Sequence, residues 1–291
     1  LALGEAWAKA RGCDPKDLAC LRALPLERLL PEEPGLEAMG RFLSNPSLFR
    51  TGPFKPHLSP FLLPQDPREA LREGKAAGIP LIAGANAEEV AFPSLQALLG
   101  PGDWEEAERR LLESGLSREK AQALLAHYRK GVPDPKRAWG EVQTDLTLLC
   151  PSLKAARLQA PHAPTYAYLF TFRAPGWEGL GAFHGLELAP LFGNLLERPF
   201  LPLFLRQEAQ EEAEYLGKKM RRYWTSFAKD GEPKGWPRWP LYREGHLLRL
   251  DVLPLVPPFA GEIKLTGVFD ALCGLKILAS LCGAHLKEAA E

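Results

Sequence analysis

The chain has 291 residues, of which 46% are hydrophobic and 25% are charged. This is the composition of a globular protein with enough chain for one large domain or two small ones. Lysine and arginine number 36, as do aspartate and glutamate, so the formal net charge is zero. A neutral chain offers no basic field for nucleic acid and no acidic tail, which favours a small or uncharged partner.

Helices and turns are expected to dominate the first eighty residues. Residues 1–30 are predicted to form two short helices separated by a turn at residues 12–15, and residues 40–68 to form irregular loop. Asp66 and Pro67 predict the start of another helix, since proline fits a first helical turn. The sequence LIAG at residues 81–84 is short, apolar and ends in glycine, which is typical of a buried parallel strand.

Helical and strand patterns alternate through the rest of the chain. Charged amphipathic segments predict helices, with Asp103 and Ser117 as caps, at residues 103–131, 136–159 and 207–230. Aromatic and β-branched runs predict strands at residues 164–172 and 246–252. The alternation predicts an α/β fold with a mostly parallel sheet, few strands and many helices. Three strands are too few for a complete doubly wound sheet of this length.

The cysteine pattern predicts no disulfide framework and no metal site. The chain contains Cys13, Cys20, Cys150, Cys273 and Cys282. The odd, scattered set favours buried free thiols, although Cys13 and Cys20 are close enough in the sequence for a local bridge. No CxxC pair or histidine-rich cluster suggests bound zinc.

Neither end of the chain predicts a membrane anchor. The chain begins with Leu1 in a helical pattern, and its first methionine is Met39. We therefore expect the natural N-terminus to lie upstream, which leaves the compartment open with a slight preference for the cytoplasm. Residues 267–286 are apolar, but Asp270 and Lys276 interrupt them, so a core or interface helix is predicted rather than a membrane span.

An acidic loop follows the first predicted strand. The sequence GANAEEVAF at residues 84–92 places Glu88 and Glu89 just beyond the carboxyl end of that strand, where functional groups of α/β sheets gather. A carboxylate there can orient a histidine and stabilise the imidazolium formed in acyl transfer. The alternative is that both glutamates complement the dipole of a following helix, and the local pattern alone favours this alternative.

A histidine flanked by glycine follows the aromatic strand. The sequence GLGAFHGLEL at residues 179–188 places His184 on a loop, where either ring nitrogen can meet a partner. A loop histidine without a special role is the alternative, and it too is favoured by the local pattern alone. Glu187 would lie beside His184 if a helix begins here.

No nucleophile elbow accompanies these two sites. Acyl transfer by a serine, histidine and acid needs a serine on a sharp GxSxG turn. No serine of the chain has glycine two positions before and two positions after it, and no HGG segment is present. In sheets that carry this elbow the chain order is serine, acid, histidine, so we expect the serine upstream of residue 1.

Several motifs in order resemble the C-terminal half of the type-B carboxylesterases, the family that includes cholinesterases and para-nitrobenzyl esterases. The resemblance runs from about Gly12 to about Leu250. Its segments are the cysteine-bounded turn at 12–22, the proline-rich stretch at 54–64, GANAEE at 84–89, GAFHGLEL at 181–188 with LFG at 191–193, YWTSFAKDGEP at 223–233 and WPLY at 239–242. Residues 253–291 match nothing in the family and are treated as a divergent tail.

The resemblance implies that residues 1–291 are the C-terminal portion of one α/β-hydrolase domain. It makes Glu89 the acid and His184 the base of a Ser–Glu–His triad, and Glu187 the buried carboxylate just after the histidine. Glu88 stands where the family usually has Asp, and Val90 where it usually has Gly. The implied activity is hydrolysis of small-molecule carboxylic esters, with no metal or organic cofactor, no nucleic-acid partner and no membrane partner.

The serine of this triad would come from the missing N-terminal half of the same domain, so the chain alone is predicted to be inactive. A non-catalytic binding or adhesion module is the alternative, because some cell-surface relatives use the fold without a serine. Retention of Glu89 and His184 argues against it. If the triad is present, Glu89 and His184 must converge to hydrogen-bond distance, and Glu187 must be buried and paired.

Overall fold

A computed structural model describes the backbone at residues 2–29, 58–90, 100–174, 178–193, 207–242, 246–252 and 262–264. Residues 40–57 of the loop predicted at 40–68 and the apolar helix predicted at 267–286 lie outside these residues. The chain divides into two compact units, Leu1–His57 and Leu58–Glu291.

The first unit contains three short helices, α1 (Ala2–Ala10), α2 (Leu18–Ala23) and α3 (Leu26–Leu29). A disulfide links Cys13 to Cys20, and Asp17 caps α2 by accepting a hydrogen bond from Cys20 N. The prediction of free thiols is wrong for this pair. In the described part of the unit only Ala8 and Cys13 are buried, so the bridge supplements a core that is too small to hold the turn. In the second unit, Cys150 is disulfide-bonded as well.

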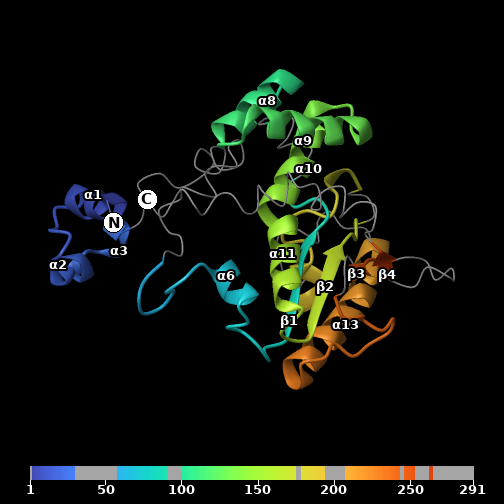
Figure 1. The fold of residues 1–291 in the computed structure, drawn as a ribbon. Helices are drawn as coiled ribbons and strands as arrows, with labels where there is room; N and C mark the ends of the chain where they lie inside the picture. Colours follow the sequence, from blue (N-terminus) through green and yellow to red (C-terminus); the bar gives the residue numbers. More distant parts are fainter. Residues whose placement is uncertain are drawn as a thin grey trace. The chain divides into compact units, whose positions relative to one another are not determined.

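The second unit is built on a four-stranded sheet in the order β1-β2-β3-β4 (Figure 1). The strands are β1 (Leu81–Asn86), β2 (Thr165–Phe170), β3 (His246–Leu250) and β4 (Glu262–Lys264). The first three strands are parallel, and β4 runs antiparallel to β3. The mostly parallel sheet and all three predicted strands are confirmed. Strand β4 was not predicted, because it lies in the tail whose sequence carries no recognisable pattern.

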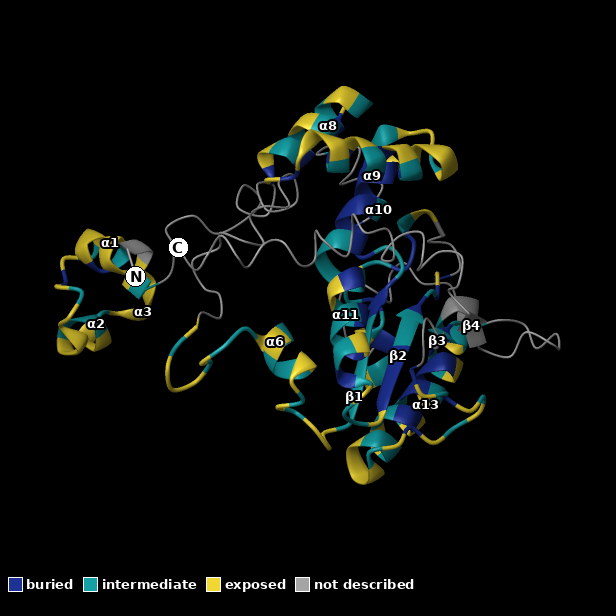
Figure 2. Cartoon of the chain, viewed as in Figure 1, coloured by how far each residue is buried: buried dark blue, intermediate teal, exposed yellow. Residues whose placement is uncertain are grey.

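Helices cover both faces of this sheet. Alternate strand residues such as Ala167 and Leu247 pack against α11 (Cys150–Gln159). The intervening residues, among them Tyr166 and Leu248, pack against α13 (Gln207–Asp230). Figure 2 shows β2 and β3 as the buried centre of the unit, whereas much of β1 is only partly buried. The alternation follows from successive side chains pointing to opposite faces of a strand.

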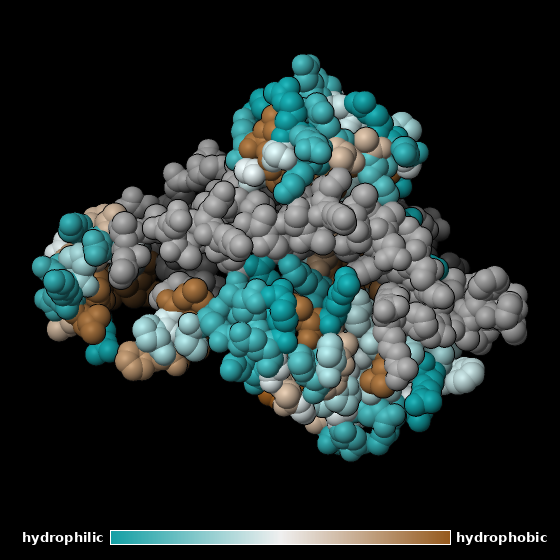
Figure 3. Space-filling view, viewed as in Figure 1, coloured by the Kyte–Doolittle hydropathy of each residue, from teal (hydrophilic) through white to brown (hydrophobic). Residues whose placement is uncertain are grey.

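A helical extension lies between β1 and β2 in the chain. It consists of α8 (Trp104–Glu113), α9 (Arg118–Gly131), α10 (Pro135–Thr144) and the π-helical turn η1 (Asp145–Leu149). Its core contains Leu111, Leu124 and Trp139, and its surface is mostly hydrophilic on the face seen in Figure 3. Asp103 caps α8 and Ser117 caps α9, as predicted.

Three short elements complete the described part of the second unit: α6 (Pro67–Arg72), η2 (Glu178–Leu180) and α12 (Leu188–Phe192). Helix α6 begins after its cap Asp66 as predicted. The helix ends at Arg72, and Gly74, just beyond the C-cap Glu73, takes the left-handed conformation that commonly follows a helix, with φ of 71°. Within the residues described, no helix is both long and apolar enough to cross a bilayer.

Candidate active site

The predicted acid and histidine lie on two loops at one edge of the sheet. Leu81 pairs with Thr165 and Asn86 with Phe170, so β1 and β2 end together. The acid loop (residues 87–90) follows β1, and the histidine loop (residues 181–187) follows β2 after η2. Because parallel strands place their carboxyl ends on the same edge, two segments far apart in the sequence meet there.

The carboxylate of Glu89 is held at both oxygens. Its Oε2 lies 2.6 Å from His184 Nδ1, and its Oε1 accepts a hydrogen bond of 2.8 Å from the backbone N–H of Asn86. The Glu89 side chain is 7% exposed. The predicted convergence of the two side chains is therefore present, and the shape of the β1 exit fixes the direction of the carboxylate.

Among the described residues, the imidazole of His184 is hydrogen-bonded at Nδ1 only. The side chain is 71% exposed. With an ionised carboxylate as partner, Nδ1 carries the proton and donates it, so Nε2 presents a lone pair. This is the arrangement a general base needs.

Asn86 joins the end of β1 to the histidine loop. It is 1% exposed, and its Nδ2 donates a 2.7 Å hydrogen bond to the carbonyl oxygen of Phe183. The same amide donates to Glu187, which is half-buried. The pairing predicted for Glu187 is present, although its burial is only partial. No role was predicted for Asn86. Its position as a polar residue at the end of an apolar strand is the feature of the sequence that could have indicated one.

Two glycines shape the site, Gly84 by allowing a close approach of β1 and β2 and Gly185 by its backbone conformation. A Cβ on Gly84 would lie 2.5 Å from both the ring and the carbonyl oxygen of Tyr168 on the paired strand. Gly185, directly after the histidine, has a φ of 81°, a conformation that costs a residue with a Cβ about 1 kcal/mol or more. These positions explain the glycines on either side of the site.

The described residues form no metal-binding cluster, and three of the described serines have their hydroxyl groups engaged elsewhere. In the part of the chain that the structure covers, no group of three or more histidine, cysteine, aspartate or glutamate side chains could hold a metal ion. The serine hydroxyls at 114 and 226 bond to backbone carbonyls, and Ser117 caps α9.

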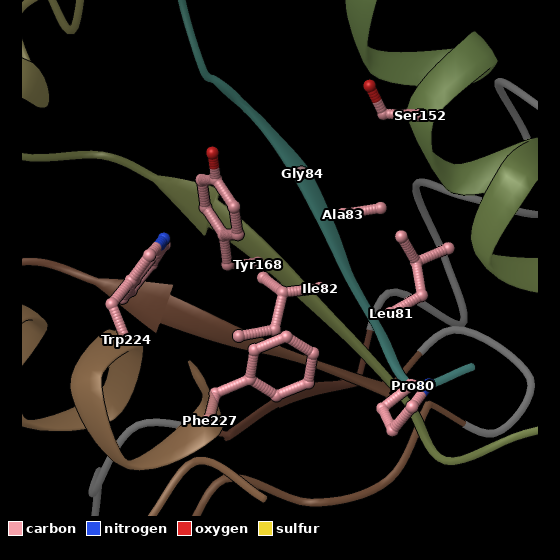
Figure 4. Close-up of a pocket in the computed structure, with 9 residues that line it drawn as sticks. All are labelled: Pro80, Leu81, Ile82, Ala83, Gly84, Ser152, Tyr168, Trp224 and Phe227. Carbon is pink, nitrogen blue, oxygen red and sulfur yellow. The ribbon is translucent and has the colours of Figure 1, made fainter. Parts of the chain in front are cut away.

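A hollow of about 440 Å³ lies beside the amino-terminal half of β1 (Figure 4). Tyr168, Trp224 and Phe227 lie on one side of the strand and Ser152 of α11 on the other. Strand β1 is the end strand of the sheet order, so within the described residues its outer edge has no strand partner.

Comparison with known proteins gives one consistent result. The sequence model of the carboxylesterase family matches residues 2–254. The chain is 30% identical to the para-nitrobenzyl esterase of Bacillus subtilis over 194 residues, which are 66% of this chain and 37% of that protein. It is 29% identical to the cocaine esterase of Oryctolagus cuniculus over 214 residues, 67% of this chain and 39% of that protein.

A solved structure of a PNB esterase superimposes with a TM-score of 0.60 at 26% identity, covering 86% of this chain and 50% of that one. The chain thus spans half or less of the length of these relatives.

Proposed function

This chain belongs to the carboxylesterase family, with its α/β-hydrolase fold, and we propose that it supplies the acid and the base of a serine esterase. The observation that carries the proposal is the 2.6 Å contact between His184 Nδ1 and Glu89 Oε2 at the carboxyl edge of the sheet. The serine belongs to the other half of the domain. This chain and that half together form the complete esterase.

In the reaction we propose, the serine hydroxyl attacks the carbonyl carbon of a small-molecule ester. His184 Nε2 takes the hydroxyl proton and then gives it to the leaving alkoxide. Glu89 keeps the imidazole in the correct tautomer and stabilises the imidazolium through Nδ1. A water molecule then attacks the acyl-enzyme as His184 takes its proton; the bond to the serine oxygen breaks, His184 returns the proton to that oxygen, and the carboxylic acid leaves. Backbone N–H groups of the other half hold the oxyanion.

The free edge of β1 is the proposed place where the serine-bearing half continues the sheet. Leu81 N donates to Pro164 O and Ala87 N donates to Phe170 O, so the odd-numbered residues of β1 pair with β2. Ile82 and Gly84 therefore direct their N–H and C=O groups outward. An added strand would pair with them and fill the hollow beside Trp224 and Phe227.

The test compares this chain with the complete esterase in hydrolysis of a short-chain nitrophenyl ester and in labelling by a fluorophosphonate, which reacts with activated serines. We expect the complete esterase to turn over and to be labelled, and His184→Ala to abolish both. We expect the 291-residue chain to do neither, because three groups that act as a unit cannot form an acyl-enzyme without the nucleophile.

Two results would contradict the proposal. Turnover by the isolated chain that disappears in His184→Ala would mean that a serine within it is the nucleophile. A complete esterase that neither hydrolyses the ester nor reacts with the fluorophosphonate would favour the alternative, a non-catalytic binding module.

A further inference from the structure

Glu88 immediately precedes the proposed triad acid, yet its carboxylate points to a different part of the histidine loop. Its Oε2 accepts a hydrogen bond of 2.7 Å from Ala182 N. Its own backbone N–H donates a hydrogen bond of 3.1 Å to Ala182 O. Ala182 is fully buried and stands two residues before His184. Glu88 of the acid loop therefore binds both the N–H and the C=O of Ala182 in the histidine loop.

The second carboxylate oxygen of Glu88 accepts from the guanidinium of Arg173. Arg173 follows β2, so the ion pair ties the acid loop to the exit of the neighbouring strand as well. The Glu88 side chain is 16% exposed, and a carboxylate that is largely withdrawn from water needs such partners to stay charged. Glu88 is therefore fully engaged in joining loops.

The histidine loop is shaped to receive this side chain. Gly181 has a φ of 67° and lies directly under Glu88, where an added Cβ would be 2.9 Å from the carboxyl carbon. Any other residue at 181 would both strain the backbone and push the carboxylate away. Gly181 is therefore required twice, for the close contact with Glu88 and for its own left-handed backbone conformation.

We propose that Glu88 is a positioning residue, which keeps the histidine loop docked so that His184 stays within reach of Glu89. The inference rests on the proposed function for its catalytic meaning, but the docking itself is a property of the two loops. Asn86 supports the same loop at other points, because it hydrogen-bonds to Phe183 and Glu187.

The experiment compares Glu88→Ala and Glu88→Gln with a matched control, Glu106→Ala. Glu106 also accepts from a backbone N–H, that of Gly102 at 2.8 Å, and pairs with Arg110, but it lies on α8. Hydrogen exchange, followed by mass spectrometry on the complete esterase, reports on the peptide at residues 178–193. We expect exchange there to rise on the order of tenfold in Glu88→Ala, since a charge-assisted hydrogen bond is lost. Glu106→Ala should leave it unchanged.

Two further readouts separate positioning from general stability. The low-field resonance of the His184 Nδ1 proton, identified by its loss in His184→Ala, should weaken in Glu88→Ala and persist in Glu88→Gln, which keeps an acceptor for Ala182 N. In ester hydrolysis, kcat should fall about 10- to 100-fold with KM nearly constant, since the loss is in alignment and not in substrate binding.

Unchanged exchange and an unchanged Nδ1 resonance in Glu88→Ala would overturn the inference. So would a loss of protection spread equally over the sheet, because Glu88 would then serve stability alone. If Glu88→Ala prevents folding, Arg173→Gln decides: it removes only the ion pair and should give a smaller effect confined to the same peptide. An inactive wild-type complete esterase would refute the proposed function, while the exchange data would still decide the docking role of Glu88.

Discussion

The two ends of β1 contrast sharply within six residues. At the carboxyl end Ala85 and Asn86 are buried, and the acid loop that follows them is hydrogen-bonded to the histidine loop. At the amino end Leu81 to Gly84 are only half-buried, and the hollow of about 440 Å³ lies beside them. The contact between Glu89 and His184 is therefore formed within this chain, whereas β1 ends the sheet that the described residues form.

The largest effect at the carboxyl end of β1 is expected from Glu89→Gln in the complete esterase. The amide can donate to Nδ1 and so favours the wrong imidazole tautomer, and it cannot stabilise the imidazolium. We expect kcat for a nitrophenyl ester to fall about 10³- to 10⁴-fold. Glu106→Gln is the control for loss of one carboxylate elsewhere. A decrease smaller than about tenfold would show that Glu89 is not the acid.

The proposal that the other half adds a strand to β1 can be tested with Ala83→Glu, which places a charge beside the hollow. Ala83 is half-buried against the α11 side of the sheet. In the isolated chain a carboxylate there can still reach water in the hollow, so the free energy of unfolding should fall by only about 1 kcal/mol. In the complete esterase the same charge would be buried without a partner, at a cost of about 3 kcal/mol or more. Urea denaturation of both forms measures the difference.

The control for this experiment is Ala156→Glu, at a fully buried position of α11. It should destabilise the isolated chain and the complete esterase alike. Equal effects of Ala83→Glu in the two forms would mean that the edge of β1 stays open in the complete esterase.

A smaller effect is expected from Asn86→Ala, which leaves Phe183 O and the Glu187 carboxylate without their donor. The loss should be about 2 kcal/mol of unfolding free energy, with kcat about tenfold lower because the histidine loop is held less firmly. Thermal unfolding and ester hydrolysis report the two quantities. Full activity at reduced stability would limit Asn86 to a structural role.

A dependence of stability on pH is expected from a buried pair behind the acid loop, Asp145 and Tyr128. Val90 N donates to the hydroxyl of Thr144, and the next residue, Asp145, accepts from Tyr128. Burial raises the pKa of Asp145 from 3.8 to about 7. The folded chain thus holds a proton that the unfolded chain releases, so this contribution to stability is full below pH 3.8 and is lost as the pH rises through about 7.

Asp145→Asn should remove most of this slope, since Asn keeps an acceptor for Tyr128 and carries no charge. Denaturation midpoints across the window from pH 3.8 to about 7 test it, because the folded and unfolded chains differ in bound protons only there. A wild-type protein whose stability rises over this range would contradict the assignment.

The fold was more predictable from the sequence than the site. Strands β1, β2 and β3 are apolar runs whose side chains meet two helical layers, so a local pattern identifies them. Strand β4 forms by pairing with β3, which leaves no local pattern. The Cys13–Cys20 bridge depends on a turn geometry that sequence spacing alone leaves undecided.

For the site, the local pattern by itself favoured unremarkable roles for Glu89 and His184, and only the family resemblance reversed that reading. The parts played by Asn86, Glu88 and Arg173 arise where loops from separate strands meet. Nothing in their own neighbourhoods in the sequence specifies which backbone group each will bind.

The long connection between β1 and β2 has a consequence for the order of folding. Joining β1 to β2 closes a loop of residues 87–164, which is entropically costly. The helical extension inside that loop has its own core around Leu111, Leu124 and Trp139, made from contacts that are local in the sequence and therefore fast to form. Once folded, it shortens the chain that must be closed. We expect pulse-labelled amides of α8 and α9 to be protected before those of β1, so the acid and the histidine would meet late in folding.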